Sequence, residues 1–306
     1  MTYQLVQKEN ETTYIIDGLA FGMPKRTSTF ILDEDKLTLI NIGATPAIKH
    51  IKTSLKQLNN LLSRVKYIII TNTELTSLGG VGVLLNACPN AQIIARESFI
   101  DTLTTPKTLI SETRAIYGDY FSDNFEPIKP VERALIKTVE DNELINISDT
   151  TQLKFILPKN KEHMMILNTK SNNLFVGHSI GVYYDQLIDD DLNLFIPSIP
   201  ARGFSDESYQ ASLDMIKKIH PTTLSFNHFG TTNKVDLALN QLSYWFELFI
   251  LIAEETTNYN ELSSKLLQAV HTYLRENNIP DNHPIYQYII LDINTCAQAM
   301  LRYTNK

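Results

Sequence analysis

One short segment limits the folds open to this chain more than any other. Residues 65–70 (VKYIII) are almost entirely apolar, and the polar loop that follows them leads into Gly79 and Gly80. A strand with one face in water alternates apolar and polar residues, whereas a nearly continuous apolar run is typical of a strand buried on both faces. Paired glycines let backbone segments pack closely where a strand turns into a helix. The segment therefore predicts a buried strand that runs into a helix.

The surrounding sequence alternates between strand and helix patterns. Apolar residues recur every three or four positions in residues 46–63, which predicts an amphipathic helix ahead of the buried strand. Residues 79–86 and 98–120 have a helical pattern, and the other segments are β-branched or alternating runs at 13–16, 28–32, 37–41, 92–95, 144–147, 153–157, 164–168 and 174–176. Two β-rich halves that each carry helices predict an α/β fold, with two sheets face to face and helices outside.

The end of the chain is richer in helix formers. Residues 235–255, 261–277 and 284–303 each predict a helix, so we divide the chain into a sandwich domain (1–230) and a helical C-terminal appendage (231–306). The appendage holds more apolar residues than a lone tail should expose: Leu237, Leu242, Trp245, Phe246, Phe249 and Ile250. We expect it to pack against the sandwich or against a second subunit, so a homodimer is one hypothesis.

Charge and cysteine content exclude several classes of partner. The 306 residues include 27 Lys or Arg against 34 Asp or Glu, a net charge of −7, which disfavours binding to nucleic acid or to an anionic membrane surface. Cys88 and Cys296 lie too far apart in sequence to form a C-x-x-C zinc or redox motif. The polar start (residues 1–14) has no signal-peptide pattern, and the longest apolar window (245–253) is too short to span a bilayer. We expect a cytoplasmic protein with no nucleic-acid or membrane partner.

Residues 67–80 (YIIITNTELTSLGG) resemble the T-H-x-H-x-D-H-x-G-G signature of the metallo-β-lactamase-fold hydrolases, with Thr71, Leu75, Gly79 and Gly80 in frame. Other landmarks follow in the order of that family. Residues 39–43 (LINIG) resemble its L-I-D-T-G segment, with Asn41 in the place of the aspartate. Further matches lie at residues 89–91 (PNA), 157–163 (LPKNKEH), 174–178 (LFVGH) and 224–230 (LSFNHFG). The resemblance spans roughly residues 13–230 and implies a four-layer αββα sandwich followed by the helical appendage.

The resemblance also implies where metal ions are held in that family. It points to seven positions, occupied in this chain by Asn72, Glu74, Thr76, Ser77, Asn160, His178 and His228. Only His228 keeps the family residue. Asn, Ser and Thr offer neutral oxygens, whereas zinc prefers imidazole, thiolate or carboxylate ligands. We therefore expect no dinuclear metal site and no cofactor. The chain is then a catalytically degenerate pseudo-enzyme, whose pocket at these positions binds a small-molecule ligand or a protein partner.

Three alternatives remain open at this stage. Glu74, His178 and His228 could together hold a single Zn, Mn or Fe ion, which would preserve a metal-dependent hydrolase. A contact between Ser77 and His228, with Glu74 nearby, has the ingredients of an activated nucleophile. The same side chains could also form an internal hydrogen-bonded cluster that only fills space.

Three more residues are candidates for lining a substrate cleft. The resemblance puts His178 where the family has an aspartate that bridges two metal ions. Tyr183, Tyr184 and Arg202 follow it, in segments that border the substrate cleft of similar proteins. Phenol and guanidinium groups there could orient an anionic or aromatic ligand. Packing in the core is the alternative explanation for the two tyrosines.

Overall fold

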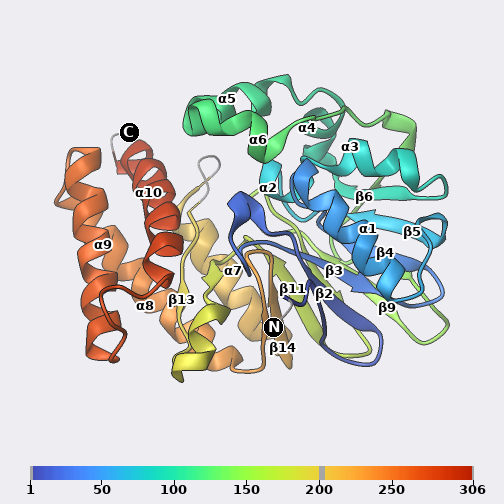
Figure 1. Cartoon of the computed structure of the whole chain (residues 1–306). Helices are drawn as coiled ribbons and strands as arrows, with labels where there is room; N and C mark the ends of the chain where they lie inside the picture. Colours follow the sequence, from blue (N-terminus) through green and yellow to red (C-terminus); the bar gives the residue numbers. More distant parts are fainter. Residues whose placement is uncertain (1–2, 200–203, 305–306) are drawn as a thin grey trace. The chain divides into compact units, whose positions relative to one another are not determined.

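The computed structural model describes residues 3–199 and 204–304 (Figure 1). Contacts divide the chain into unit 1, Met1–His178 with Pro221–Thr232, and unit 2, Ser179–His220 with Asn233–Lys306. Residues 179–220 thus group with the C-terminal helices rather than with the sheets. The division into domains at residue 230 stays a prediction.

The first sheet of unit 1 is built around the segment that opened the sequence analysis. Within the described residues its seven strands lie in chain order: β1 (Val6–Lys8), β2 (Thr13–Asp17), β3 (Ser28–Leu32), β4 (Leu37–Ile40), β5 (Val65–Ile69), β6 (Gln92–Arg96) and β7 (Ile136–Val139). Strands β1 to β4 pair antiparallel, and β4 to β7 pair parallel. The short strands β1 and β7 were not predicted, because three or four residues carry too little periodicity.

Helices follow the parallel strands, as a parallel sheet requires. In α1 (Ile48–Gln57), Ile48, Ile51 and Leu55 join the core of the first sheet. This helix is shorter than predicted: Pro46 lies in a preceding 3₁₀ turn, and Asn59 adopts a φ of 54° just beyond the helix end. The remaining helices of unit 1 are α2 (Leu75–Leu78), α3 (Val81–Leu84), α4 (Ile100–Thr104), α5 (Lys107–Tyr117) and α6 (Phe121–Phe125).

The second sheet of unit 1 packs face to face against the first. Among the described residues its order is β15–β14–β11–β10–β9–β8. The rings of Phe30 on β3 and Phe175 on β11 meet edge to face, with centroids 5.0 Å apart, inside the shared core. The strands of this sheet are β8 (Leu144–Asn146), β9 (Gln152–Ile156), β10 (Met165–Asn168), β11 (Asn173–Gly177), β14 (Thr223–Phe226) and β15 (Thr231–Thr232).

The carboxyl ends of the parallel strands in the two sheets are joined by backbone contacts. Gly177 ends β11 with a φ of 59°, and a Cβ atom there would lie 2.6 Å from the Thr71 hydroxyl, so only glycine fits. The Asn227 N–H donates to the Gly177 carbonyl, and the Ser28 N–H donates to the Asn227 carbonyl. The segment after β14 is thereby fixed to both sheets.

Unit 2 contains the hairpin β12 (Val182–Tyr183) and β13 (Phe195–Ile196), together with α7 (Asp206–Ile219), α8 (Val235–Glu254), α9 (Tyr259–Glu276) and α10 (Ile285–Thr304). The last three helices agree with the prediction within a few residues. Helix α7 was missed, although its end signals are present in the sequence. Ser205 caps its start, Asp206 and Glu207 lie in its first turn, and Lys217 and Lys218 lie in its last.

Helix α8 changes one expectation. The apolar window 245–253 was judged too short to span a bilayer, but the helix is continuous over 20 residues and includes an 18-residue window of mean hydropathy 1.3. By length and composition α8 could cross a membrane, and it is the one helix in the described part of the chain that could. One third of that window is buried inside the protein. The cytoplasmic location and the absence of a membrane partner therefore stay predictions.

Short 3₁₀ helices complete the described secondary structure, at Ala20–Gly22, Thr45–Ala47, Leu62–Arg64, Leu85–Ala87, Glu97–Phe99, Gly118–Tyr120, Arg133–Leu135 and Asp185–Asp190.

Candidate functional site

Polar side chains gather in unit 1 where strands of both sheets end. Asn41 follows β4, Thr71 and Asn72 follow β5, His178 follows β11, and Asn227 follows β14. All five residues are almost fully buried. In open α/β sheets this edge is the usual place for ligands, because the loops beyond the carboxyl ends of parallel strands form a crevice there. The site therefore lies where the fold would place one.

The direction of the hydrogen bonds in this cluster follows from one backbone group. The N–H of Thr71 donates to Asn41 Oδ1 at 3.0 Å, so the other end of the Asn41 amide must be its nitrogen. That nitrogen donates to Asn227 Oδ1 at 2.7 Å. The Asn227 nitrogen then faces Ser77 Oγ at 2.8 Å and His178 Nε2 at 2.9 Å. His178 Nε2 therefore accepts a hydrogen bond, and the ring proton lies on Nδ1.

The protonated side of His178 faces a carboxylate. Glu74 Oε2 lies 2.7 Å from His178 Nδ1. The carboxylate lies outside the direction of a regular hydrogen bond from the ring, so the contact is a close electrostatic one between the polar Nδ1–H group and the carboxylate. Both ring nitrogens of His178 are thus engaged inside the protein.

Local contacts hold Glu74 in place. Its backbone N–H donates to Asn72 Oδ1 at 3.0 Å, which makes a tight turn after β5. The Thr76 hydroxyl donates to Glu74 Oε2 at 3.2 Å. Glu74 then precedes the first turn of α2, and its carbonyl accepts the N–H of Ser77. The loop sequence N-T-E-L-T-S therefore sets the position of the carboxylate.

Two further imidazoles influence Glu74. The rings of His178 and His228 cross at 68° with centroids 4.4 Å apart. His163 pairs with Asn72 through a backbone bridge and is almost fully buried. Burial raises the pKa of Glu74, but the charge and hydrogen bonding of His178, followed by His228 and His163, outweigh burial and lower it to about 2. Glu74 is therefore ionised at neutral pH, although 42% of its side-chain surface is exposed.

The pKa values of His163 and His228 are lowered, whereas a histidine paired with a carboxylate usually has a raised pKa. Burial lowers the pKa of His163 to about 4, with Glu74 opposing the shift. Burial also lowers the pKa of His228 well below its ordinary value, and the charges of His178 and Arg26 add to this effect. Both rings are neutral near pH 7, since desolvation penalises the charged form.

The structure brings together most of the predicted site residues, but not all. Glu74, Thr76, Ser77, His178 and His228 lie in one cluster, and Asn72 joins it by accepting the Glu74 N–H. Ser77 Oγ accepts a hydrogen bond from Asn227, which differs from the contact with His228 that one of the open alternatives requires. Asn160 folds back on its own loop, where its Oδ1 accepts the Glu162 N–H.

The predicted cleft residues have a different setting. The Tyr183 ring stacks on Phe195, with centroids 4.5 Å apart, and its hydroxyl donates to Asn193. The Tyr184 hydroxyl donates to Asp292 at 2.9 Å. Both tyrosines are buried within unit 2, as the packing alternative expects. Arg202 lies outside the described residues.

Sequence reasoning missed three members of the cluster: Asn227, Asn41 as its partner, and His163. Asn41 was noted only as a substitution, and Asn227 adjoins a ligand position without occupying one. Their contact joins residues 186 positions apart. His163 was noted only as part of a landmark. Its signal was a histidine three residues after Asn160, in the loop where the family carries a ligand.

A metal centre is not apparent from the arrangement of these side chains. Within residues 3–199 and 204–304, no group of three or more His, Cys, Asp or Glu side chains is arranged to hold a metal ion.

Comparison with known proteins identifies the fold. No family model and no curated protein matches the sequence. Solved structures do match. A metallo-β-lactamase superfamily protein from the archaeon Sulfolobus tokodaii is 17% identical, with a TM-score of 0.67 over 96% of this chain and 99% of that one. A metallo-β-lactamase family protein from Thermus thermophilus is 14% identical, with a TM-score of 0.65 over 96% and 94%. The chain has the metallo-β-lactamase fold.

A subclass B3 metallo-β-lactamase described as having an active-site glutamic acid also matches. It is 14% identical, with a TM-score of 0.54 over 80% of this chain and 93% of that one. The predicted fold class, a mixed α/β sandwich of the metallo-β-lactamase type with a helical C-terminal region, is confirmed. Identities this low establish the fold and leave the chemistry of the site to be argued from its own residues.

The metallo-β-lactamase fold of this chain should lose stability below neutral pH because it buries neutral imidazoles. The pKa of His163 is about 4 in the folded protein, against an ordinary value of 6.5. Its neutral form supports folding fully above the ordinary value, and this support is lost as the pH falls toward the folded value. At pH 5 we expect a loss of about 2 kcal/mol from His163.

Urea denaturation at neutral pH and near pH 5 measures this loss. The His163→Gln variant should show a smaller fall in the free energy of unfolding than the wild type. His228 remains in both proteins, so their difference isolates His163. Equal falls in the two proteins would contradict the assignment.

Proposed function

We propose that this chain is a catalytically degenerate metallo-β-lactamase-fold protein that binds a ligand or partner without a dinuclear metal site. The main support for this proposal is that both ring nitrogens of His178 already have contacts within the protein. The resemblance puts this residue where the family has the aspartate that bridges two metal ions. Here its Nε2 accepts from Asn227 and its Nδ1 faces Glu74, so neither nitrogen offers a free lone pair to a metal.

The remaining donors support the same proposal. Asn72, Thr76, Ser77 and Asn160 provide neutral amide or hydroxyl groups, which suit zinc poorly. Asn72 Oδ1 and Asn160 Oδ1 already accept backbone N–H groups, and Ser77 accepts from Asn227. The residues present do not fit the dinuclear zinc site of the fold family.

Unsatisfied polar atoms favour a ligand over simple filling of space. The amide nitrogen of Asn72 and both ring nitrogens of His163 are buried and have no hydrogen-bond partner among the described residues. Each such group costs about 1–3 kcal/mol when it is left unpaired, and native proteins retain few of them. Groups held in this state are available to a bound molecule.

Charge narrows the class of ligand. Glu74 is ionised at neutral pH and is partly exposed, so it repels an anion. The Asn72 amide nitrogen requires a hydrogen-bond acceptor, and neutral His163 offers one donor and one acceptor. We therefore propose a small neutral or cationic molecule with hydrogen-bonding groups.

One alternative has an observation in its favour. Glu74 lies 2.7 Å from His178, and the His178 and His228 rings are 4.4 Å apart, so a carboxylate and two imidazoles converge. A subclass B3 metallo-β-lactamase described as having an active-site glutamic acid has the same fold. A single Zn, Mn or Fe ion held by Glu74, His178 and His228 would support a hydrolase, but it would have to displace Asn227 or the Nδ1 proton.

Elemental analysis separates the two functions. Protein purified without chelator should carry far less than one Zn, Mn or Fe ion per chain, because both nitrogens of His178 are already engaged. It should also hydrolyse β-lactams and phosphodiesters no faster than buffer does.

The variants His178→Ala and His271→Ala provide the comparison. His271 is a partly exposed histidine on α9 in unit 2 and pairs with Asp281, so it controls for the loss of any one imidazole. One metal per chain, lost in His178→Ala and kept in His271→Ala, would refute the proposal and establish the single-metal hydrolase.

A thermal-shift screen of neutral and cationic metabolites tests the ligand. A true ligand at a hundred times its Kd should stabilise the fold by about 2.7 kcal/mol. The effect should disappear in Asn72→Ala, because that variant removes the free amide nitrogen.

The matched control is Asn90→Ala, which removes an exposed amide that bonds only the Ser63 carbonyl. It should keep the full shift. If no compound stabilises the wild type and Asn72→Ala is itself strongly destabilised, the cluster is structural.

A further inference from the structure

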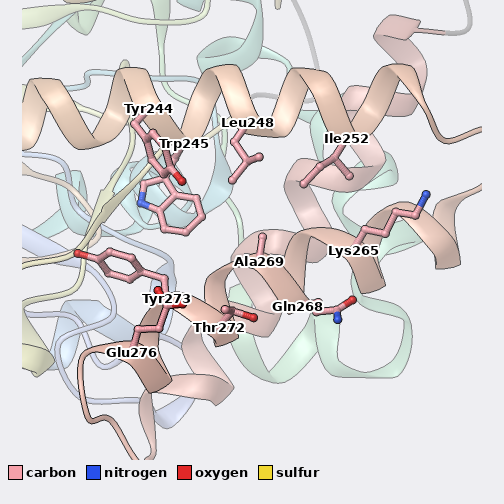
Figure 2. Close-up of a pocket in the computed structure, with 10 residues that line it drawn as sticks. All are labelled: Tyr244, Trp245, Leu248, Ile252, Lys265, Gln268, Ala269, Thr272, Tyr273 and Glu276. Atoms are coloured by element: carbon pink, nitrogen blue, oxygen red, sulfur yellow. The ribbon is translucent and has the colours of Figure 1, made fainter.

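Helices α8 and α9 of unit 2 form a pocket of about 510 Å³ (Figure 2). Leu248 and Ile252 line it from α8, and Ala269 lies opposite on α9. Tyr244 on α8 and Glu276 on α9 stand at one end, with Trp245 and Tyr273 between them, and Ile252 and Lys265 stand at the other end. The pocket therefore has an apolar wall on α8, a wall on α9 in which Gln268 and Thr272 flank Ala269, and one charged side chain at each end.

The apolar surface continues beyond the pocket along α8. Leu237, Tyr244 and Leu251 follow one another at intervals of seven residues and have exposed fractions of 39%, 58% and 59%. The opposite face of α8, which includes Leu242, Phe246 and Phe249, is buried. A helix that is apolar on two sides is typical of one that is covered on both. The inner side is covered within unit 2, and the outer side is not.

The charges of the pocket are arranged for a two-fold axis. Lys265 and Glu276 are eleven residues apart on α9, which corresponds to about 16 Å along the helix. Consider a two-fold axis that lies in the outer face, runs across both helices and passes near Leu248 and Ala269. A second copy related by this axis faces the first with the two ends of the pocket exchanged. Lys265 of one copy then meets Glu276 of the other, and Tyr244 meets Ile252.

We propose that the outer face of α8 and α9 is the interface of a homodimer, and that a second copy of this chain fills the pocket. The arrangement is self-complementary, which an isologous interface requires. The exposed apolar residues of α8, Leu237, Tyr244 and Leu251, would be buried in the dimer. The two Lys265–Glu276 pairs would fix how the helices of the two copies align. Glu276 has no ion pair among the described residues of its own chain, whereas Lys265 pairs with Glu261 at 2.8 Å. Lys265 of the second copy would therefore give Glu276 an ion-pair partner.

Sedimentation equilibrium of the whole protein over a wide range of concentrations tests the interface. The wild type should be a dimer at high concentration. Leu248→Asp should raise the dimer Kd by about 100-fold, because it puts a charge at the centre of the apolar face.

Charge reversal tests the register. Lys265→Glu and Glu276→Lys should each raise the dimer Kd by about tenfold, because each brings like charges together across the interface. The double variant should recover most of the wild-type affinity. Lys217→Glu on α7 is the matched control, since Lys217 is an exposed lysine that also pairs with an acid on its own helix. It should leave the dimer unchanged. These surface variants keep the test decisive even if Leu248→Asp fails to fold.

Three results would overturn the proposal. The protein could remain a monomer at every concentration, or it could form a dimer that Leu248→Asp and the charge reversals leave intact. The third result is flotation of the wild type, but not of Leu248→Asp, with vesicles of phosphatidylcholine and phosphatidylserine. That would assign the outer face of α8 to a lipid surface instead.

Discussion

The backbone N–H of Thr71 can only donate a hydrogen bond, and the buried site depends on that restriction. It fixes the Asn41 amide, which fixes the Asn227 amide, which in turn makes His178 Nε2 an acceptor. Each side chain is almost completely buried, so reversing any one amide would place two donors or two acceptors face to face. One backbone group just after β5 thus determines that the ring proton of His178 lies on Nδ1, the nitrogen that faces Glu74.

The same strand ends tie the two sheets of unit 1 together. Gly177 lets β11 approach Thr71, and Asn227 bonds the backbone of both Gly177 and Ser28. In the fold family, metal ions would bridge loops at this edge. In this chain we propose that amide and imidazole hydrogen bonds perform that cross-linking. Neutral amides avoid the like-charge repulsion that a carboxylate cluster would suffer without a metal. Glu74 keeps its charge because its neighbours, His178 above all, hold its pKa at about 2 despite burial.

The fold could be predicted because apolar runs, helical periodicity and the order of the family landmarks are all visible in the sequence. The apolar run at residues 65–70 and the order of the landmarks were enough for the sandwich, although Lys66 is exposed and the strand is not buried on both faces along its whole length. Periodicity was enough for α8, α9 and α10. Short elements such as β1 and β7 carry too few residues for a pattern. Helix α7 shows that terminal signals are easily overlooked when the flanking segment is read as a loop.

The site was only partly predictable, for a physical reason. Glu74, His178 and His228 could be placed together from their positions after strands. The hydrogen bonds among them could not, because the Asn41–Asn227 contact joins distant segments and neither residue type indicates its partner. The local bond of Asn160 could not be predicted either, because an Asn in a loop can accept from the backbone of its own segment or reach a distant partner. The contacts of Tyr183 with Phe195 and of Tyr184 with Asp292, both within unit 2, could not be predicted from the sequence either.

The protonation of the His178 ring tests the account most directly. A ¹H–¹⁵N correlation spectrum of the histidine rings at neutral pH, with His178 assigned by comparison with His178→Gln, reports which nitrogen carries the proton. The account predicts a proton on Nδ1, none on Nε2, and no change when zinc is added. A proton on Nε2, or a zinc-dependent shift of the His178 signals, would contradict it.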